Sequence, residues 1–410
     1  MNMRSLLPGL AAVALAALSV AQEVPAAENL AEAFTMGEAG VSFRYRFEYV
    51  DQDALVEDAE ASTLRGRVNF KTDPWNGFFA FGELDYVANI LWDDYNAGAG
   101  NTPDKLQYPV VADPTGPDLN QAYLAWDNGK GTLLRGGRQR ILLDNQRFIG
   151  AVGWRQNEQT FDAGYFNHDF DGFHLQLAYV WQVNRIFGDD VPAGQDDHNT
   201  SLVNLSREWP GHGTLSAYFY DIDNQDNGLL SSRSVGLRWA GDGKWAEKVV
   251  KYTLEYAHQS DSHDQAVDYD AHYYRADLAV ELGGLTPSIG YESLGGNAGR
   301  IGAAFQTPLA TLHGFNGWAD KFLTTPDAGL VDVFVGLKGG LGAWSWNLVY
   351  HDFNAESGSG SYGSELDGSV SRKFGEEYEL LLKATRFDGD HGPAFDDTSK
   401  LWVQFTADLK

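Results

Sequence analysis

The chain has 410 residues, no cysteine and a formal net charge of -27 at pH 7. The lack of cysteine excludes disulfides and thiolate metal centres, and the acidity argues against nucleic acid as a partner. With 43% hydrophobic and 13% aromatic residues, the chain is too apolar to be disordered, and no break in composition divides it, so we expect one large folded unit.

The N-terminal residues predict a secretory signal peptide. Arg4 lies in a short basic start, an apolar stretch runs from Leu6 to Leu18, and Ser19-Val20-Ala21 is a small-residue cleavage site. After this segment no run of about 18 apolar residues occurs, as a membrane-spanning helix would need. The expected organisation is a cleaved signal peptide at 1–21, a short periplasmic segment at 22–39 and an outer-membrane barrel at 40–410.

Alternating segments follow along the whole chain. In residues 41–49 the odd positions are apolar or aromatic and the even positions are polar, including Arg44 and Arg46. Residues 63–70 repeat the pattern with Arg65 and Arg67 on the polar face. Such a period of two predicts strands with one face in an apolar environment and the other in water. Further alternating segments lie at 173–184, 250–256, 344–350 and 401–409.

The connections between these segments alternate in length. Tight links at 73–77 and 127–131 contrast with longer polar links at 88–118, 141–159 and 294–329. Short periplasmic turns and long extracellular loops are typical of outer-membrane barrels. We therefore predict an all-β transmembrane antiparallel up-and-down β-barrel of about 18 strands, with 16 also compatible, in the outer membrane of a Gram-negative bacterium. The alternative is a secreted all-β sandwich array. Five tryptophans near strand ends are expected in the interfacial girdles: Trp126, Trp209, Trp239, Trp344 and Trp402.

Several segments are more specific than a barrel requires. They are NQAYL (120–124), GRQRI (137–141), LDNQRFIG (143–150), GWRQNEQTFD (153–162) and TPLATLHGFNGWADKF (307–322). These segments resemble the alginate export family of outer-membrane porins, and the resemblance extends from about residue 40 to the end. It implies an eighteen-stranded barrel that passes an anionic uronate polysaccharide outward through an arginine-lined pore.

Arginines are the candidate selectivity elements. Residues 133–157 contain five arginines and a single acid, Asp144. A ring of guanidinium groups in a pore attracts carboxylates and sets ion selectivity. The alternative is that the arginines form internal ion pairs with Glu48, Glu83, Asp85 or Glu158 and brace the barrel. The candidates are Arg44, Arg46, Arg65, Arg67, Arg135, Arg138, Arg140, Arg147 and Arg155.

Two long connections are candidates for inward loops. Residues 142–159 suit a constriction that hydrogen-bonds to hydroxyls and carboxylates; the alternative is an outward loop packed against a neighbour. Residues 315–322 suit a second inward loop or a lid, and an ordinary extracellular loop is the alternative. The constriction candidates are Asn145, Gln146, Trp154, Gln156, Asn157 and Glu158, and the lid candidates are Trp318, Asp320 and Lys321.

Metal binding and catalysis have little support. The acidic segment at 261–270 offers oxygen ligands for Ca²⁺ but lacks the glycine and spacing of an EF-hand loop, so solvated charge or bridging to lipopolysaccharide is the better interpretation. The ten histidines lie in no nucleophile or zinc motif. We expect no cofactor, no metal and no enzyme activity. The weak calcium candidates are Asp261, Asp264, Asp268 and Asp270.

Together these features predict a passive channel for anionic sugars or polysaccharide of the uronate type. Its expected surroundings are outer-membrane lipid and lipopolysaccharide, and directed export would require a periplasmic partner because a barrel stores no energy. Two alternatives stay open: a general small-solute diffusion porin, and a surface-structural barrel whose acidic loops bind divalent ions.

Overall fold

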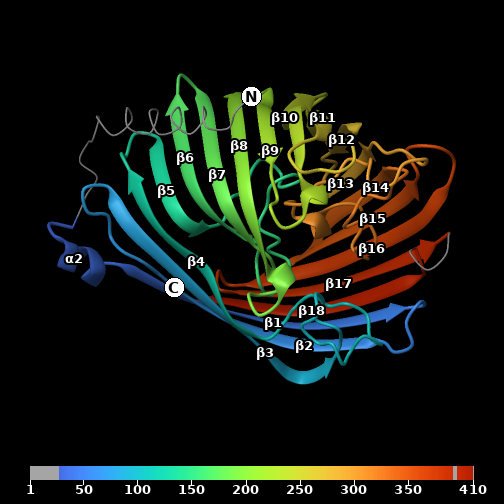
Figure 1. The fold of residues 1–410 in the computed structure, drawn as a ribbon, viewed down its shortest axis with the longest axis horizontal. Coiled ribbons are helices and arrows are strands. Elements are labelled where there is room, and N and C mark those ends of the chain that lie inside the picture. The colour runs from blue at the N-terminus through green and yellow to red at the C-terminus, as the bar shows by residue number, and fades with distance from the viewer. Residues whose placement is uncertain (1–26, 391–394, 410) are drawn as a thin grey trace.

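A single closed wall of 18 antiparallel strands forms the protein in the computed structural model, which describes residues 27–390 and 395–409. Each strand pairs with its neighbours in sequence, and β1 (Glu38–Gln52) closes the barrel by pairing with β18 (Thr398–Leu409) (Figure 1). This confirms the predicted fold class and strand number. The predicted signal peptide at 1–21 lies outside the described residues.

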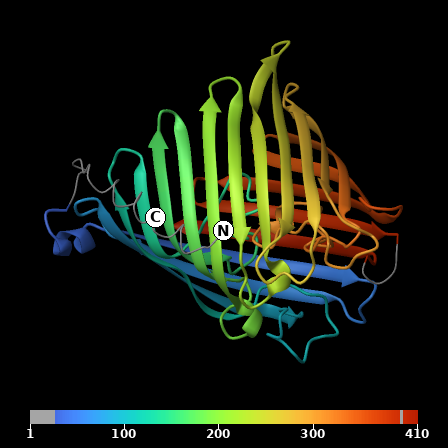
Figure 2. The same ribbon diagram turned by 45° about the horizontal axis from the view of Figure 1, so that its top comes forward.

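The remaining elements follow one another round the wall (Figure 2). A short helix, α2 (Leu30–Thr35), precedes β1, and the side chain of Asn29 caps it by accepting from the backbone N–H of Glu32. Among the described residues, no helix is long and apolar enough to cross a membrane. The other elements are β2 (Ala59–Lys71), β3 (Phe78–Asp94), β4 (Gly116–Asp127), β5 (Thr132–Gln139), β6 (Thr160–Phe170), β7 (Phe173–Asn184), η2 (Pro192–Gly194), β8 (Gln195–Trp209), β9 (Gly213–Ile222), η3 (Gly228–Leu230), β10 (Ser232–Trp245), β11 (Lys248–Asp261), β12 (Asp270–Val280), β13 (Leu285–Leu294), η4 (Leu312–Gly314), β14 (Leu330–Leu341), β15 (Trp344–Asn354), β16 (Ser361–Phe374) and β17 (Tyr378–Gly389).

The two faces of the wall differ in polarity because successive side chains point to opposite sides of a strand. On β1 the outward Phe43 is 42% exposed, whereas Arg46 and Glu48 on the other face are fully buried. Large apolar side chains are similarly exposed along the other strands, for example Leu237 and Leu382. The outer face is therefore the surface that meets lipid, and the inner face carries the polar groups.

The two ends of the barrel have connections of different length. At the end where the chain enters β1 and leaves β18, the links are as short as residues 171–172. At the other end lie long links, of which residues 140–159 and 295–329 are two. By the usual arrangement of outer-membrane barrels, the short-link end is periplasmic and the long-link end extracellular. One periplasmic turn needs glycine at Gly77, whose φ is +82° and where a Cβ would lie 2.4 Å from the Asp127 carbonyl oxygen.

The tryptophans only partly follow the predicted girdles. Trp209, the last residue of β8, is exposed as predicted, whereas Trp239 is exposed in the middle of β10 and not near its end. Trp402 is fully buried, so the prediction is wrong for it. Side chains alternate between the two faces of β18, and Trp402 lies on the same face as the buried Lys400, whereas Leu401 on the other face is exposed. Trp126 is also buried, with its ring 6.4 Å from that of Phe78.

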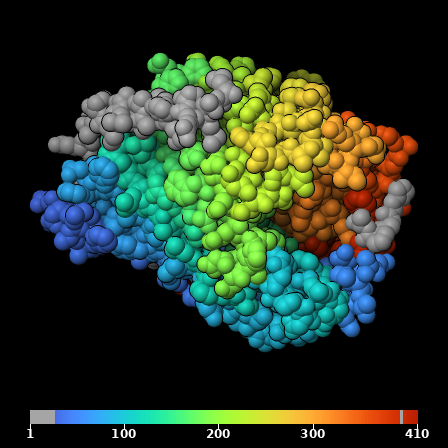
Figure 3. Space-filling model, in the orientation of Figure 1, coloured from blue at the N-terminus to red at the C-terminus, as the bar shows by residue number. Residues whose placement is uncertain are grey.

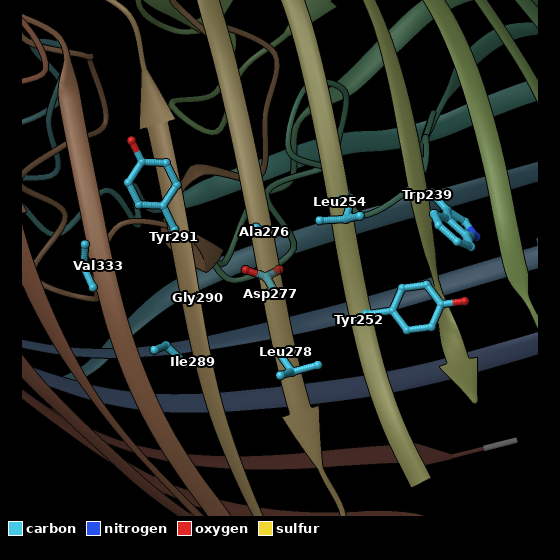
Figure 4. A pocket seen from close by; sticks show the side chains of 10 residues that line it. All are labelled: Trp239, Tyr252, Leu254, Ala276, Asp277, Leu278, Ile289, Gly290, Tyr291 and Val333. Carbon is cyan, nitrogen blue, oxygen red and sulfur yellow. The ribbon is translucent and has the colours of Figure 1, made fainter. Parts of the chain in front are cut away.

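A shallow hollow of about 560 Å³ lies on the outer face of β10 to β14 (Figure 4). It forms where the small Ala276 stands among larger outward side chains, including Trp239, Tyr252 and Ile289. Its lining is almost wholly apolar, as expected of a surface that meets acyl chains. The groups that could act on a polar solute lie instead inside the barrel.

Candidate functional site

Two long connections fold into the lumen and join there. We call residues 140–159 the constriction segment and residues 295–329 the inner segment. The Gly150 N–H donates to the Leu309 carbonyl at 2.9 Å, and the Thr311 N–H donates to the Gln146 carbonyl at 3.0 Å. The Gln159 side chain adds a bond to the Leu309 carbonyl at 3.0 Å. The two segments therefore form one hydrogen-bonded unit across the inside of the barrel.

Arg147 fastens this unit to the wall at β13. Its Nε lies 2.6 Å from Glu292 Oε1, and its two terminal nitrogens donate to Thr307 Oγ1 and Asn316 Oδ1, each at 2.9 Å. The side chains of Arg147 and Glu292 are 2% and 1% exposed, so the pair is removed from solvent. Such a pair is stable only because every charged atom has partners. Arg147 thus links both segments to the barrel and does not face an aqueous path.

Glu158 is the centre of a second ion-pair cluster at the wall formed by β2 and β3. Arg67 donates to Glu158 Oε1 at 3.1 Å and Asn120 donates to Oε2 at 3.0 Å, while Arg140 also bonds Oε2. Burial alone would raise the pKa of Glu158, but the charges of Arg67 and Arg140 lower it to about 2. Asp85 completes the cluster by accepting from Arg67 Nε at 2.6 Å.

The arginines of β1 hold the constriction segment from the other side. Arg44 donates to the Gly153 carbonyl at 2.9 Å and to Gln156 Oε1 at 3.0 Å. Arg46 lies 3.4 Å from Asp113 and also donates to the Trp154 carbonyl. Backbone carbonyls that would face the lumen are therefore satisfied by guanidinium groups of the wall.

A third cluster connects the constriction segment, the inner segment and β18. Arg155 Nη1 lies 3.0 Å from Glu48, and its Nη2 lies 3.2 Å from Asp320. Asp320 also accepts from Lys400 at 2.9 Å and from His313 Nδ1 at 2.6 Å. Burial lowers the pKa of His313 to about 3 despite the neighbouring Asp320, so this histidine is neutral at physiological pH.

Most of the nine candidate arginines are thus engaged in ion pairs. Seven of them, all except Arg44 and Arg135, have a carboxylate oxygen within 4.0 Å. Arg135 lies over the rings of Tyr123 and Tyr165, at 5.6 and 4.4 Å. The four carboxylates expected as partners from the sequence, Glu48, Glu83, Asp85 and Glu158, all take part. The bracing alternative therefore describes most of these side chains.

The remaining predicted residues have different surroundings. Asn145 accepts from the Arg147 N–H at 3.3 Å, and Asn157 is buried. Trp318 and Lys321 lie in the inner segment, where Lys321 pairs with Asp396 at 2.6 Å. Arg138 pairs with Asp162 at 2.8 Å.

The acidic side chains at the ends of the link after β11 have hydrogen-bond partners of their own. Within residues 27–390 and 395–409, no group of three or more His, Asp or Glu side chains is arranged to hold a metal ion. Asp261 instead accepts from the Tyr269 N–H at 2.9 Å, and Asp270 pairs with His258 at 3.0 Å.

A cavity of about 540 Å³ opens at the extracellular end, above the constriction; we call it the vestibule. Its lining includes four cationic side chains and one carboxylate, Asp320. The cations come from the constriction segment, the link after β7, the inner segment and β18: Arg155, Arg185, Lys321 and Lys400. Apolar side chains form much of the rest, among them Leu55, Val110, Val152, Ile186, Phe187 and Leu312.

Neighbouring connections build the vestibule wall. The segment around residue 100 and that around residue 187 lie side by side in Figure 3, and Asn101 donates to the Phe187 carbonyl at 3.0 Å. Arg185 is held by a bond to the Pro308 carbonyl at 3.0 Å. Neither Arg185 nor Lys400 was a sequence candidate, because each is a single cation outside the dense run of arginines. Only the fold brings them together.

Solved structures of Pseudomonas aeruginosa porins share this architecture. OccK1 (OpdK) matches with a TM-score of 0.69 at 12% identity, covering 92% of this chain and 99% of that chain. OccK2 (OpdF) matches with a TM-score of 0.70 at 13% identity, covering 92% and 98%. A structure of OpdK with vanillate matches with a TM-score of 0.68 at 12% identity, covering 92% and 99%. At these identities the likeness shows the fold alone.

Sequence comparisons give the family. A search of curated proteins found no match. The family model for alginate export matches residues 37–290, which is more than half of the chain. This agrees with the resemblance drawn from the motifs at 119–163 and with the closed outer-membrane barrel. The chain belongs to the alginate export family of outer-membrane β-barrel porins.

Proposed function

We propose that this porin is a passive channel for small solutes that carry a carboxylate, with uronate sugars and short uronate oligosaccharides as the first class. The observation that supports this is the charge of the vestibule, whose lining has four cations and one anion in a chain of net charge -27. Low-dielectric walls focus the field of such residues and raise the local concentration of anions. The vestibule is therefore the proposed main selectivity element. Its cations also have carboxylate partners, and of these only Asp320 lines the cavity: Asp320 lies beside Arg155 and Lys400, Asp196 lies 3.9 Å from Arg185, and Asp396 lies 2.6 Å from Lys321.

The lumen favours a small solute over a long polymer. The constriction and inner segments are joined to each other and to the wall by buried ion pairs such as Arg147–Glu292 and Arg155–Glu48. Passage of a polymer would require both segments to leave these partners. A barrel also supplies no energy, so the direction of flow follows the solute gradient unless a periplasmic partner drives it.

The apolar part of the vestibule widens the proposed class. Side chains such as Phe187 and Leu312 line it beside the cations, which suits solutes with an apolar body and one carboxylate. Vanillate, with which the similar barrel of OpdK was solved, is an aromatic carboxylate of this kind. The permeation rates of uronates and of apolar carboxylates into proteoliposomes are therefore to be compared directly.

Neutralising two vestibule cations is expected to lower anion selectivity. In the double variant Arg185→Gln/Lys321→Gln, the net charge of the residues that line the vestibule falls from +3 to +1. Because a unit charge about 4 Å away contributes about 1 kcal/mol even in water, the anion-to-cation permeability ratio should fall about fivefold or more. The ratio is measured from the reversal potential in planar bilayers under a potassium chloride gradient.

The matched control is Lys105→Gln/Arg386→Gln. These two cations also lie toward the extracellular end, where they pair with Asp93 at 3.0 Å and Asp397 at 2.7 Å, but they do not line the vestibule. Their loss removes the same charge and should leave the permeability ratio nearly unchanged. Equal falls in both double variants would mean that overall surface charge, not the vestibule, sets selectivity.

A further inference from the structure

A lysine ammonium group lies in an aromatic cage inside the lumen. Lys383 is on the inner face of β17 and is 6% exposed. Its Nζ is 3.8 Å from the centre of the Trp318 ring, 4.2 Å from that of Trp154 and 5.1 Å from that of Trp402. The ammonium also donates to His313 Nε2 at 2.6 Å. Three electron-rich faces and one nitrogen acceptor thus surround one cation.

The cage joins four separate parts of the chain. Trp154 belongs to the constriction segment, His313 and Trp318 to the inner segment, Lys383 to β17 and Trp402 to β18. The rings also contact one another, since Trp154 and His313 stack at 4.7 Å with an interplanar angle of 7°. Trp402 lies edge-on to both of these rings at 5.8 Å. Lys383 contacts all four rings, whereas two other cations reach one ring each: Arg46 lies 4.1 Å from the centre of the Trp154 ring and Lys400 lies 5.9 Å from that of Trp402.

Neighbouring bonds fix the histidine as an acceptor. The N–H at Nδ1 of His313 donates to Asp320, which leaves the Nε2 lone pair facing Lys383. Glu365 on β16 holds the inner segment by accepting from the Trp318 and Ala319 N–H groups. This end of the inner segment is therefore held by the wall independently of the lysine. The Trp154 end of the constriction segment is held at β1 by Arg46, which donates to the Trp154 carbonyl and lies 4.1 Å from the centre of its ring, and it reaches β17 through the cage.

We propose that Lys383 is the positioning residue of the constriction: its caged ammonium fixes Trp154 against the wall at β17 and β18 and so sets the width of the lumen. The proposal rests on the proposed function only in that the lumen conducts ions. Cation–π contacts are strongest where solvent is excluded, as it is here. Without the ammonium, His313 Nε2 would lose its donor and the three rings would face an unfilled space.

The test is chemical rescue of Lys383→Ala in planar bilayers. The substitution removes three methylenes and the ammonium, which together have the shape of n-propylammonium. We expect the single-channel currents to show an additional level of higher conductance, the wide level, beside the normal narrow level. The ratio of time spent in the wide level to time spent in the narrow level should rise roughly tenfold or more, as expected from the loss of a desolvated cation–π contact. Millimolar n-propylammonium should restore the narrow level, and n-propanol should not. Lys383→Arg, which keeps the charge, should stay close to the unmutated protein.

Lys251→Ala is the matched control, because Lys251 lies near the periplasmic end of β11 and pairs with Glu281 at 2.6 Å, away from the cage. Its currents should match those of the unmutated protein. A folded Lys383→Ala barrel with unaltered currents would overturn the proposal, and so would equal rescue by n-propanol, since the lysine would then only fill space.

A second variant is used if Lys383→Ala does not fold into a barrel. Folding is judged from the faster-migrating band that folded barrels give in unheated gel samples. Trp318→Leu keeps the lysine and removes one wall of the cage. It should show the same wider level, and unaltered currents in a folded Trp318→Leu barrel would contradict the proposal. If the unmutated channel is cation-selective, the proposed function is refuted. The comparison of conductance levels between the variants and the unmutated protein is unaffected, because it reports the width of the lumen.

Discussion

Replacing Arg147 with methionine is expected to lower the free energy of unfolding of the barrel by about 3 kcal/mol, the lower end of the usual cost of breaking a buried ion pair, because Arg275 still lies 3.5 Å from Glu292. The affected group is Glu292, whose side chain is 1% exposed and lies 2.6 Å from Arg147 Nε. Thr307 and Asn316 would lose their bonds to the guanidinium as well. Urea unfolding of the barrel in lipid vesicles measures the change.

Two further variants isolate the buried pair. Arg147→Met/Glu292→Leu replaces both charges with apolar groups and should recover much of the lost stability. Arg233→Met removes a half-exposed arginine that lies 3.2 Å from Asp221, and should cost at most about 1 kcal/mol. If Arg147→Met is no more costly than Arg233→Met, the constriction is not fastened to β13 as described.

Acidification is expected to weaken the cluster around Glu158. The pKa of this carboxyl is lowered from 4.5 to about 2 in the folded barrel. A carboxyl with a depressed folded pKa contributes stability above its unfolded pKa and loses it as the pH falls through the folded one. The contribution is therefore complete above about pH 4.5, amounts to about 3 kcal/mol, and disappears by about pH 2.

Glu158→Gln should remove this pH dependence. The variant should be less stable than the unmutated protein by about 3 kcal/mol at pH 7, and the difference should shrink toward zero near pH 2. Unfolding midpoints in urea across this pH range give the comparison. Glu57→Gln, at an exposed glutamate, is the control and should follow the unmutated protein. A difference that stays constant with pH would rule out the ion pairs as its cause.

The sequence was sufficient for the wall of the barrel. Alternation with a period of two is a local property, so it predicted the strands and placed Arg44 and Arg67 on the inner face. It was not sufficient where two strand faces are both apolar or aromatic. Leu401-Trp402-Val403 has no polar alternation, and Trp402 was therefore assigned to the lipid interface although it belongs to the lumen cage.

Contacts across the lumen could not be predicted from spacing. Arg147 and Glu292 are 145 residues apart, and their pairing depends on how two long connections fold inside the barrel. Two of the four vestibule cations, Arg185 and Lys400, were missed for the same reason, whereas Arg155 and Lys321 were candidates from the sequence. A dense run of arginines draws attention in a sequence, whereas Arg185 and Lys400 gather only through closure of the wall. Cations of this kind are to be expected at strand positions that face the lumen and lie next to a long connection.

Reversal potential is the most direct test of the central claim, that the channel passes small anions. Purified unmutated protein in a planar bilayer under a potassium chloride gradient should give a reversal potential of the sign set by chloride, and added glucuronate should reduce the chloride current by occupying the vestibule. A reversal potential of the sign set by potassium would contradict the account, because the net charge of the chain would then govern passage and the basic vestibule would not.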